Sequence, residues 1–270
     1  MTINPGHAGL VWGIKPQKAP TSMHLSRYRT AAAFLTAVVG AMTWLTAPTA
    51  AEGQAVHVIE MFTSQGCSSC PPADRLLKTF AGRTDVIALS FHVDYWDRLG
   101  WKDTFGSPAF TKRQRDYALR RGDGKVYTPQ AVINGRLHEV GHNRSAIERA
   151  MSASDAAAQR VPVTLSLKSG QLRVTAASAS GQKSAGGIVT LLGVQTQGAV
   201  TATRGENSGE RLAYTNIVRS MTTLGPWLGS SFETSIAVSH PSLAGADAVV
   251  VLIQRTGDGP IIGATWLGLK

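Results

Sequence analysis

The stretch FTSQGCSSCPP, residues 62–72, decides how the sequence is interpreted, because it places a Cys-x-x-Cys motif between two regular elements. Residues 55–62 are apolar enough to form a buried strand. After the motif, Pro71 and Pro72 fit the first turn of a helix that continues through residues 74–80. We therefore expect the two cysteines at a turn that leads from a strand into the start of a helix.

This position gives the two sulfurs different roles. Unpaired N–H groups and the positive end of the helix dipole favour the thiolate of Cys67, which we expect to be the attacking nucleophile. Cys70 is close enough to displace a partner that has been captured on Cys67. A disulfide between them would close too short a loop to stabilise the fold much. The exchange role requires the Cys67 sulfur to be reachable.

Two metal-binding alternatives compete with a redox role. Structural zinc sites also use Cys-x-x-Cys, but they need two further ligands at a suitable spacing, and the sequence contains no second cysteine pair. We therefore predict no zinc site. A Cu(I) site made of Cys67, Cys70 and His92 stays open as an alternative, since thiolates and imidazole suit that soft ion.

The segment after the motif continues with alternating strands and helices. Asn134-Gly135 is a strong hairpin signal, and a βαβ-α-ββ-α order predicts a thioredoxin-like α/β domain over residues 52–155. In that order the Thr128–Pro129 bond is expected to be cis and to lie beside the dithiol, with Thr128 lining a groove for an extended substrate. The expected elements are a strand at 86–93, a helix at 107–121, strands at 130–133 and 136–140, and a helix at 143–151.

The C-terminal part has a different pattern of apolar and polar residues. Apolar and polar residues alternate over 161–167, and again over 172–176 after a turn, which is typical of a half-exposed antiparallel hairpin. We predict a mostly β, sandwich-like domain over residues 160–270, joined through an Ala- and Ser-rich linker at 152–159. Further strands are expected at 188–195, 246–254 and 261–267.

An aromatic-rich connection follows the second predicted strand, at the sheet edge where sites of α/β proteins gather. His92 would move a proton or stabilise the thiolate, and Asp94 would orient the imidazole. Aromatic side chains would wall a groove beside Cys67, although a structural role is the slightly favoured explanation for His92 and for each Trp taken alone, the Trp residues then packing against the β domain. These aromatic residues are Tyr95, Trp96 and Trp101.

The N-terminus has the three parts of a secretory signal peptide. A basic segment at 27–29 precedes an apolar stretch at 31–47 and a run of small residues, so we expect residues 1–51 to direct export, with cleavage after Ala50 or Ala51. An uncleaved anchor is the alternative, and translation starting at Met23 is a further hypothesis. We therefore predict a periplasmic or secreted protein.

Composition excludes several classes of protein. With 270 residues, 43% of them hydrophobic, 16% charged and two cysteines, the chain is neither disordered, nor polytopic in a membrane, nor a disulfide-dense miniprotein. The net charge of +10 includes four basic residues in the predicted signal region. We predict no nucleic-acid partner, because the one dense basic group reads as a solvated helix face. That group is Lys112, Arg113, Arg115, Arg120 and Arg121.

Several longer motifs carry a family resemblance. The sequence resembles the secreted thioredoxin-like family known as domain of unknown function 1223, from Val56 to the C-terminus, and the resemblance implies the thioredoxin-like fold and the dithiol but no substrate. The motifs are EMFTSQGCSSCPPAD at 60–74, FHVDYWD at 91–97, LGWKD at 99–103, YTPQ at 127–130, GEN at 205–207 and Asn216.

These features predict an exported thiol–disulfide oxidoreductase. Cys67, Cys70, Pro129, His92 and Asp94 would carry the reaction. No nicotinamide or flavin fingerprint is present, so we expect no cofactor, and the electrons would pass to or from the thiols or disulfides of a partner protein. No membrane contact is expected after signal cleavage. A copper-delivery protein and a non-catalytic interaction protein remain the alternatives.

Overall fold

The computed structural model describes residues 56–154, 161–178, 186–256 and 259–269. The predicted signal region, most of the predicted linker and the predicted domain boundary between 155 and 160 lie outside the described residues. Among the helices that are described, none is long and apolar enough to cross a membrane.

The first half of the described chain contains the predicted elements. Ser107 caps the second helix by accepting a hydrogen bond from the backbone N–H of Ala109, and Asn143 caps the third in the same way. Positive φ angles at Asn134 and Gly135 form the predicted hairpin turn. The elements are β1 (His57–Thr63), α1 (Pro71–Ala81), β2 (Val86–His92), the 3-10 helix η1 (Asp97–Leu99), α2 (Pro108–Arg121), β3 (Gln130–Ile133), β4 (Leu137–Val140) and α3 (Arg144–Ala153).

The second half is built from strands, as predicted, but two of them are absent from the sequence-based prediction. These two are β8, whose burial alternates irregularly along the strand, and the short strand β9. The elements are β5 (Val163–Lys168), β6 (Gln171–Ala176), β7 (Gly187–Thr201), β8 (Arg211–Trp227), β9 (Phe232–Ala237), the 3-10 helix η3 (Pro241–Leu243), β10 (Ala248–Arg255) and β11 (Ile261–Gly268).

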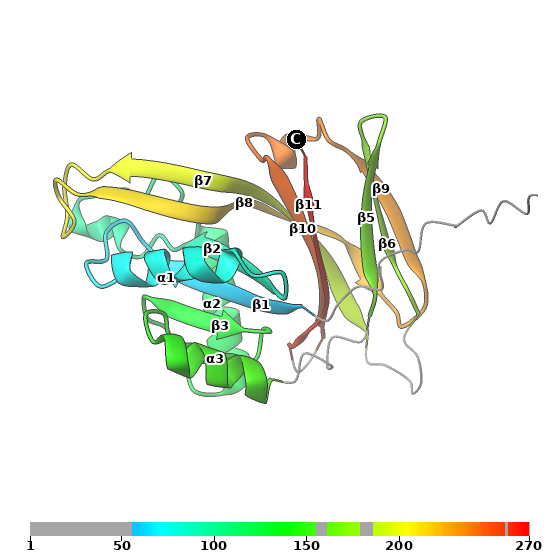
Figure 1. The fold of residues 1–270 in the computed structure, drawn as a ribbon, viewed down its shortest axis with the longest axis horizontal. Helices are drawn as coiled ribbons and strands as arrows, with labels where there is room; N and C mark the ends of the chain where they lie inside the picture. Colours follow the sequence, from blue (N-terminus) through cyan, green and yellow to red (C-terminus); the bar gives the residue numbers. More distant parts are fainter. Residues whose placement is uncertain (1–55, 155–160, 179–185, 257–258, 270) are drawn as a thin grey trace, which may run out of the picture. The chain divides into compact units, whose positions relative to one another are not determined.

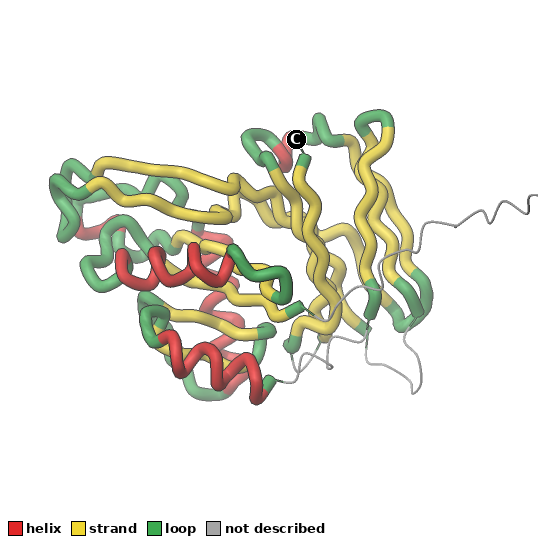
Figure 2. Tube along the Cα trace, viewed as in Figure 1, coloured by secondary structure: helices red, strands yellow, loops and turns green. Residues whose placement is uncertain are grey.

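The predicted fold class is wrong. Instead of a thioredoxin-like α/β domain followed by a sandwich-like β domain, both halves contribute to one eight-stranded mixed sheet with the order β11-β10-β7-β8-β2-β1-β3-β4 (Figure 1). The junction is a short parallel contact in which Ser90 of β2 faces Ile217 of β8, and the Asn216 side-chain amide donates to the carbonyl of Ala88. Figure 2 shows the strands in yellow running through both halves.

The long β7–β8 hairpin makes this junction possible. Register shifts at Val189/Thr190 and Gly193/Val194 mark bulges, which bend a strand pair and increase its twist. One end of β7 pairs with β10, while the other end of the hairpin continues past β2. The loop at residues 202–210, between β7 and β8, therefore reaches the Cys-x-x-Cys turn, a contact that two separate domains would not predict.

The core also joins the two halves. Phe62 and Phe91 from β1 and β2 belong to the same buried cluster as Leu192 and Val250 from β7 and β10. A second cluster, which includes the fully buried Trp227, lies between the smaller sheet, of order β5-β6-β9, and the β7-β10-β11 part of the large sheet. A third cluster packs α1 and α3 against β1 and β3.

One predicted surface residue is buried. Arg113, expected on a solvated basic helix face, instead donates from Nε to Glu60 Oε1 at 2.7 Å and from a terminal nitrogen to the Tyr117 hydroxyl at 2.7 Å. Tyr117 in turn donates to Glu60, and Gln254 of β10 completes the network. The guanidinium thus neutralises a carboxylate that has no exposed surface.

Candidate functional site

Cys67 and Cys70 form a disulfide at the start of α1, with their Cα atoms 5.4 Å apart. The turn before the helix is closed by hydrogen bonds from the Cys67 N–H to the carbonyl of Ser64 and from the Cys70 N–H to the carbonyl of Cys67. Cys70 is the N-cap of α1, so the predicted position of the motif between strand and helix is confirmed. Ser68 and Ser69, between the cysteines, are exposed.

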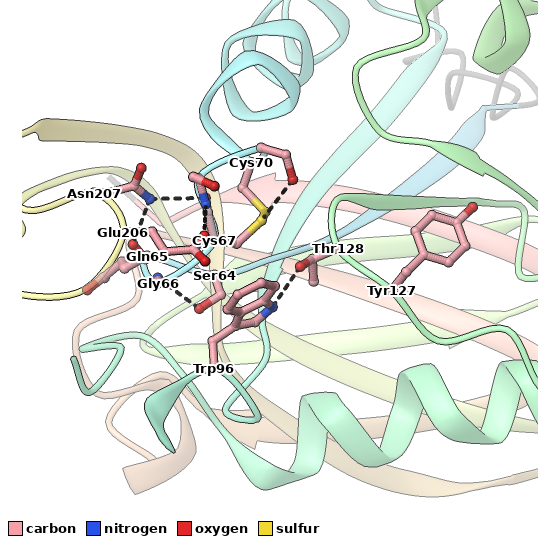
Figure 3. The surroundings of a disulfide bond; sticks show 12 residues. Ser64, Gln65, Gly66, Cys67, Cys70, Trp96, Tyr127, Thr128, Glu206 and Asn207 are labelled. Carbon is pink, nitrogen blue, oxygen red and sulfur yellow. Dashed lines mark hydrogen bonds between the residues drawn. A yellow bond between two sulfur atoms is a disulfide. The ribbon is translucent and has the colours of Figure 1, made fainter. Parts of the chain in front are cut away.

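The two cysteines themselves are 0% exposed. The expectation that Cys67 would be reachable is therefore wrong for this disulfide form. The loop at residues 202–210, which we call the covering loop, binds the motif directly: the Asn207 amide donates to the carbonyls of Gln65 and Cys67 at 2.9 and 3.0 Å, and Glu206 accepts from the Ser68 N–H at 3.1 Å (Figure 3).

Trp96 packs on the other side of the turn and connects it to Thr128. A Cβ added to Gly66 would lie 3.1 Å from the Cβ of Trp96, so the indole approaches the backbone beside Cys67 closely. The Trp96 Nε1–H donates to the Thr128 hydroxyl at 2.8 Å, as Figure 3 shows. Trp96 thus packs beside the motif and links the predicted groove residue Thr128 to it.

Pro129 lies near the start of α1. The Thr128–Pro129 peptide bond is cis, as expected. A Cβ added to Gly141 would lie 2.9 Å from the Cβ of Pro129 and 3.1 Å from the Cβ of Ala73, so the proline and the first turn of the helix meet at this glycine. Pro129 therefore lies beside the first turn of α1, and Thr128 is joined to the motif through Trp96.

The aromatic-rich connection is fastened to Gln65, two residues before Cys67. Asp103 Oδ2 accepts from the backbone N–H of Gln65 at 2.8 Å. The side-chain oxygen of Gln65 accepts from Trp101 Nε1 at 2.9 Å, and its amide nitrogen donates to the Thr104 hydroxyl at 2.9 Å. Trp101 therefore positions the motif, and it also approaches Gly205 of the covering loop.

His92 is oriented by Asp103 and not by Asp94 as predicted. The imidazole Nδ1 lies 2.9 Å from Asp103 Oδ2, and both side chains are fully buried. Burial favours a higher pKa for Asp103, but the imidazole and the backbone N–H groups of Gln65 and Phe105 outweigh it and lower that pKa. Asp94 instead accepts a hydrogen bond from the Thr111 hydroxyl at 2.5 Å, which ties the connection to α2.

Tyr95 also faces α2. Its hydroxyl donates to the Gln114 side chain at 3.3 Å, and burial raises the pKa of Tyr95 to about 12, so it stays protonated. Of the three aromatic residues predicted to wall a groove, Trp96 and Trp101 touch the motif segment, whereas Tyr95 serves the packing of the connection on the helix.

Asp74 is a site residue that the sequence analysis missed. It lies on the buried face of α1 with Ala73, Leu77 and Phe80, and it is 5% exposed. Burial raises the pKa of Asp74 to about 7, although the nearby His92 opposes the shift. An acidic residue on the apolar face of the predicted helix, four positions after Cys70, was the available signal.

The copper alternative finds no support in the described residues, where no three His, Cys, Asp or Glu side chains are arranged to hold a metal ion. His92, the third proposed ligand, contacts Asp103 through Nδ1, whereas its Nε2 has no hydrogen-bond partner in the described part of the chain.

The site is thus a Cys-x-x-Cys disulfide at the start of a helix that packs on a mixed sheet, with the acidic side chain of Asp74 buried on the same helix. The chain belongs to the family described as protein of unknown function (DUF1223), whose model matches residues 58–254. This match confirms the assignment to domain of unknown function 1223. No curated protein matches this chain.

Among solved structures, the chain is similar to protein AGR_C_4864 from Agrobacterium tumefaciens, at 32% identity and a TM-score of 0.69, over 79% of this chain and 94% of that one. A superoxide reductase from Giardia intestinalis also matches, at 12% identity and a TM-score of 0.23, over 40% of this chain and 96% of that one. The second match carries no argument about fold or function.

Proposed function

We propose that this protein exchanges disulfides with a partner protein through Cys67 and Cys70. The observation that carries the proposal is the disulfide between two cysteines that flank only Ser68 and Ser69 at the start of α1. Because a disulfide that closes so short a loop removes little entropy from the unfolded chain, stabilisation of the fold does not explain this bond well. The N-terminal end of a helix, by contrast, favours the thiolate that exchange requires.

The exchange has two steps in the direction that reduces this protein. A partner thiolate attacks Cys67 Sγ, the bond between Cys67 and Cys70 breaks, and Cys70 leaves as a thiolate that takes up a proton. The partner's second thiol, after losing its proton, attacks its own sulfur in the mixed disulfide and releases Cys67. The partner ends as a disulfide and this protein as a dithiol; the reverse sequence oxidises a partner dithiol.

We infer that the covering loop opens for exchange, because neither sulfur is exposed and the loop binds the backbone on both sides of Cys67. Three hydrogen bonds from the side chains of Glu206 and Asn207 hold the loop to the motif. Each contributes on the order of 1 kcal/mol, so an open state a few kcal/mol above the closed one is within the range of local opening. Ser68 and Ser69 are exposed and offer a partner its first contact beside the sulfurs.

We also propose that exchange takes place outside the cytoplasm. The support is the predicted signal peptide at residues 1–51 and the presence of a disulfide, since such bonds persist in oxidising compartments.

Catalysed reduction of insulin by dithiothreitol tests the proposal. The wild-type protein should accelerate the reduction above the uncatalysed rate, and Cys67→Ser should abolish the acceleration. Ser152→Ala, on the exposed surface of α3, is the control and should behave as wild type. A Cys67→Ser variant with wild-type activity, or a wild-type protein with no activity, would contradict the proposal.

A further inference from the structure

Four buried polar atoms on β1, α1 and β2 have no well-formed hydrogen bond in the described part of the chain: Thr63 Oγ1, Asp74 Oδ1, Ser90 Oγ and His92 Nε2. The Asp74 carboxyl lies close enough to the Thr63 hydroxyl to interact with it, which opposes the rise in the Asp74 pKa. Leaving such atoms unpaired costs free energy, and native structures rarely do so without a functional reason. Asp74 and His92 also interact electrostatically. The cluster lies on the inner side of α1, away from the exposed Ser68 and Ser69.

The helix geometry directs Asp74 toward Cys70. Cys70 has helical dihedral angles, and the Asp74 N–H donates to the carbonyl of Cys70 at 3.1 Å, so the two residues stand one turn apart on the same face. Side chains four residues apart have Cβ atoms about 5–6 Å apart. Helical side chains also lean toward the N-terminus, which brings the Asp74 carboxyl toward the Cys70 sulfur.

We propose that Asp74 is the proton donor and acceptor for Cys70 during disulfide exchange, an inference that rests on the proposed function. When a partner thiolate attacks Cys67, the S–S bond breaks and the electron pair remains on Cys70. Protonated Asp74 then gives its proton to the Cys70 thiolate and becomes a carboxylate. In the reverse direction, the Asp74 carboxylate takes the proton from the Cys70 thiol, which attacks the mixed disulfide at Cys67.

The surroundings of Asp74 suit this task. The titratable and charged groups that face it come from several elements: His92 on β2, Asp103 in the connection, Arg75 on α1 and Tyr214 on β8. Burial dominates among them and brings the pKa of the Asp74 carboxyl to about 7, where a group both gives and accepts protons at neutral pH. His92 is less suited, because its Nδ1 is committed to Asp103.

The pH dependence of disulfide reduction tests the assignment. The rate of reduction by dithiothreitol, divided by the thiolate fraction of that reagent, should show an inflection near pH 7 in the wild type. Asp74→Asn should lose the inflection and react about 100-fold more slowly, and Asp74→Glu should restore part of the rate. Asp116→Asn, an acid-to-amide change on the surface of α2, is the matched control and should retain the wild-type profile.

A titration of the wild-type protein gives a readout that a merely structural role would not move. A carboxylate and a thiolate at close range disfavour each other's charge, so the ¹³C shift of the Asp74 carboxyl should titrate at higher pH in the reduced protein than in the disulfide form. In Cys70→Ser, adding reductant should leave that titration unchanged. This titration tests the role of Asp74 in the wild-type protein and therefore does not depend on whether Asp74→Asn folds.

The outcomes separate the two proposals. If wild-type protein exchanges disulfides but Asp74→Asn keeps its rate and its inflection, or if the Asp74 titration is the same in both redox forms, the role of Asp74 is overturned and the proposed function stands. If wild-type protein exchanges no disulfides with any dithiol, the proposed function itself fails.

Discussion

Replacing Asn207 by alanine should expose the disulfide without unfolding the protein. The Asn207 amide makes two hydrogen bonds, to the carbonyls of Gln65 and Cys67, and each is worth roughly 0.5–1.5 kcal/mol. Their loss should ease the opening of the covering loop by about 1–3 kcal/mol, which raises the open population about 5- to 150-fold. If reduction proceeds through this opening, its rate should rise by the same factor.

The assay is the pseudo-first-order rate of disulfide reduction by dithiothreitol at pH 8, with urea unfolding as a parallel measure of global stability. Asn143→Ala is the control. The Asn143 side chain caps α3 by accepting a hydrogen bond from the N–H of Ala146 at 3.1 Å, and its loss should lower the free energy of unfolding by about 1 kcal/mol. That control should not accelerate reduction. Equal rates for Asn207→Ala and wild type, or equal acceleration by both variants, would refute the gating role of the loop.

Three further predictions concern charge. The pKa of Asp74 is about 7 in the folded protein against an ordinary value of 3.8, so the folded state favours the protonated carboxyl. The free energy of unfolding should therefore fall by about 4 kcal/mol as the pH rises from 4 to 8. Urea unfolding at a series of pH values should show this fall in the wild type and a smaller one in Asp74→Asn. Arg113→Leu leaves the buried Glu60 carboxylate unpaired and should cost about 3–5 kcal/mol in the same assay, whereas Lys112→Leu, on the exposed face of α2, should cost less than about 1. Glu206→Gln removes a negative charge beside the Ser68 N–H, so the Cys67 thiol of the reduced protein should titrate at lower pH with a thiol reagent; an unchanged titration would mean that Glu206 does not act on that thiol.

Local patterns predicted the surroundings of the disulfide well. The apolar run before Cys67 and the prolines after Cys70 placed the motif between β1 and α1, and Asn134-Gly135 marked the β3–β4 turn. These features depend on nearby residues, through helix capping, turn conformation and strand propensity, and so they can be read from a single sequence.

The order of the strands in the sheet and the contacts between the covering loop and the motif depend on residues that are distant in the sequence. β8 joins β2 through the pairing of Ser90 with Ile217, and polar residues and bulges hide the strand pattern of β8. The hydrogen bonds from Asn207 to the carbonyls of Gln65 and Cys67 follow from that junction, so they were not predictable from local signals. The choice of Asp103 over Asp94 as the partner of His92 likewise depends on how the connection folds back toward Gln65.

A covalent trap is the most direct test of exchange at Cys67. Reduced Cys70→Ser protein, mixed with insulin, should accumulate a mixed disulfide through Cys67 that dithiothreitol releases, because the resolving thiol is missing. Mass spectrometry of the trapped species should identify Cys67, and Cys67→Ser should trap far less. No adduct with Cys70→Ser, while the denatured variant reacts fully, would contradict the claim that this protein exchanges disulfides through Cys67.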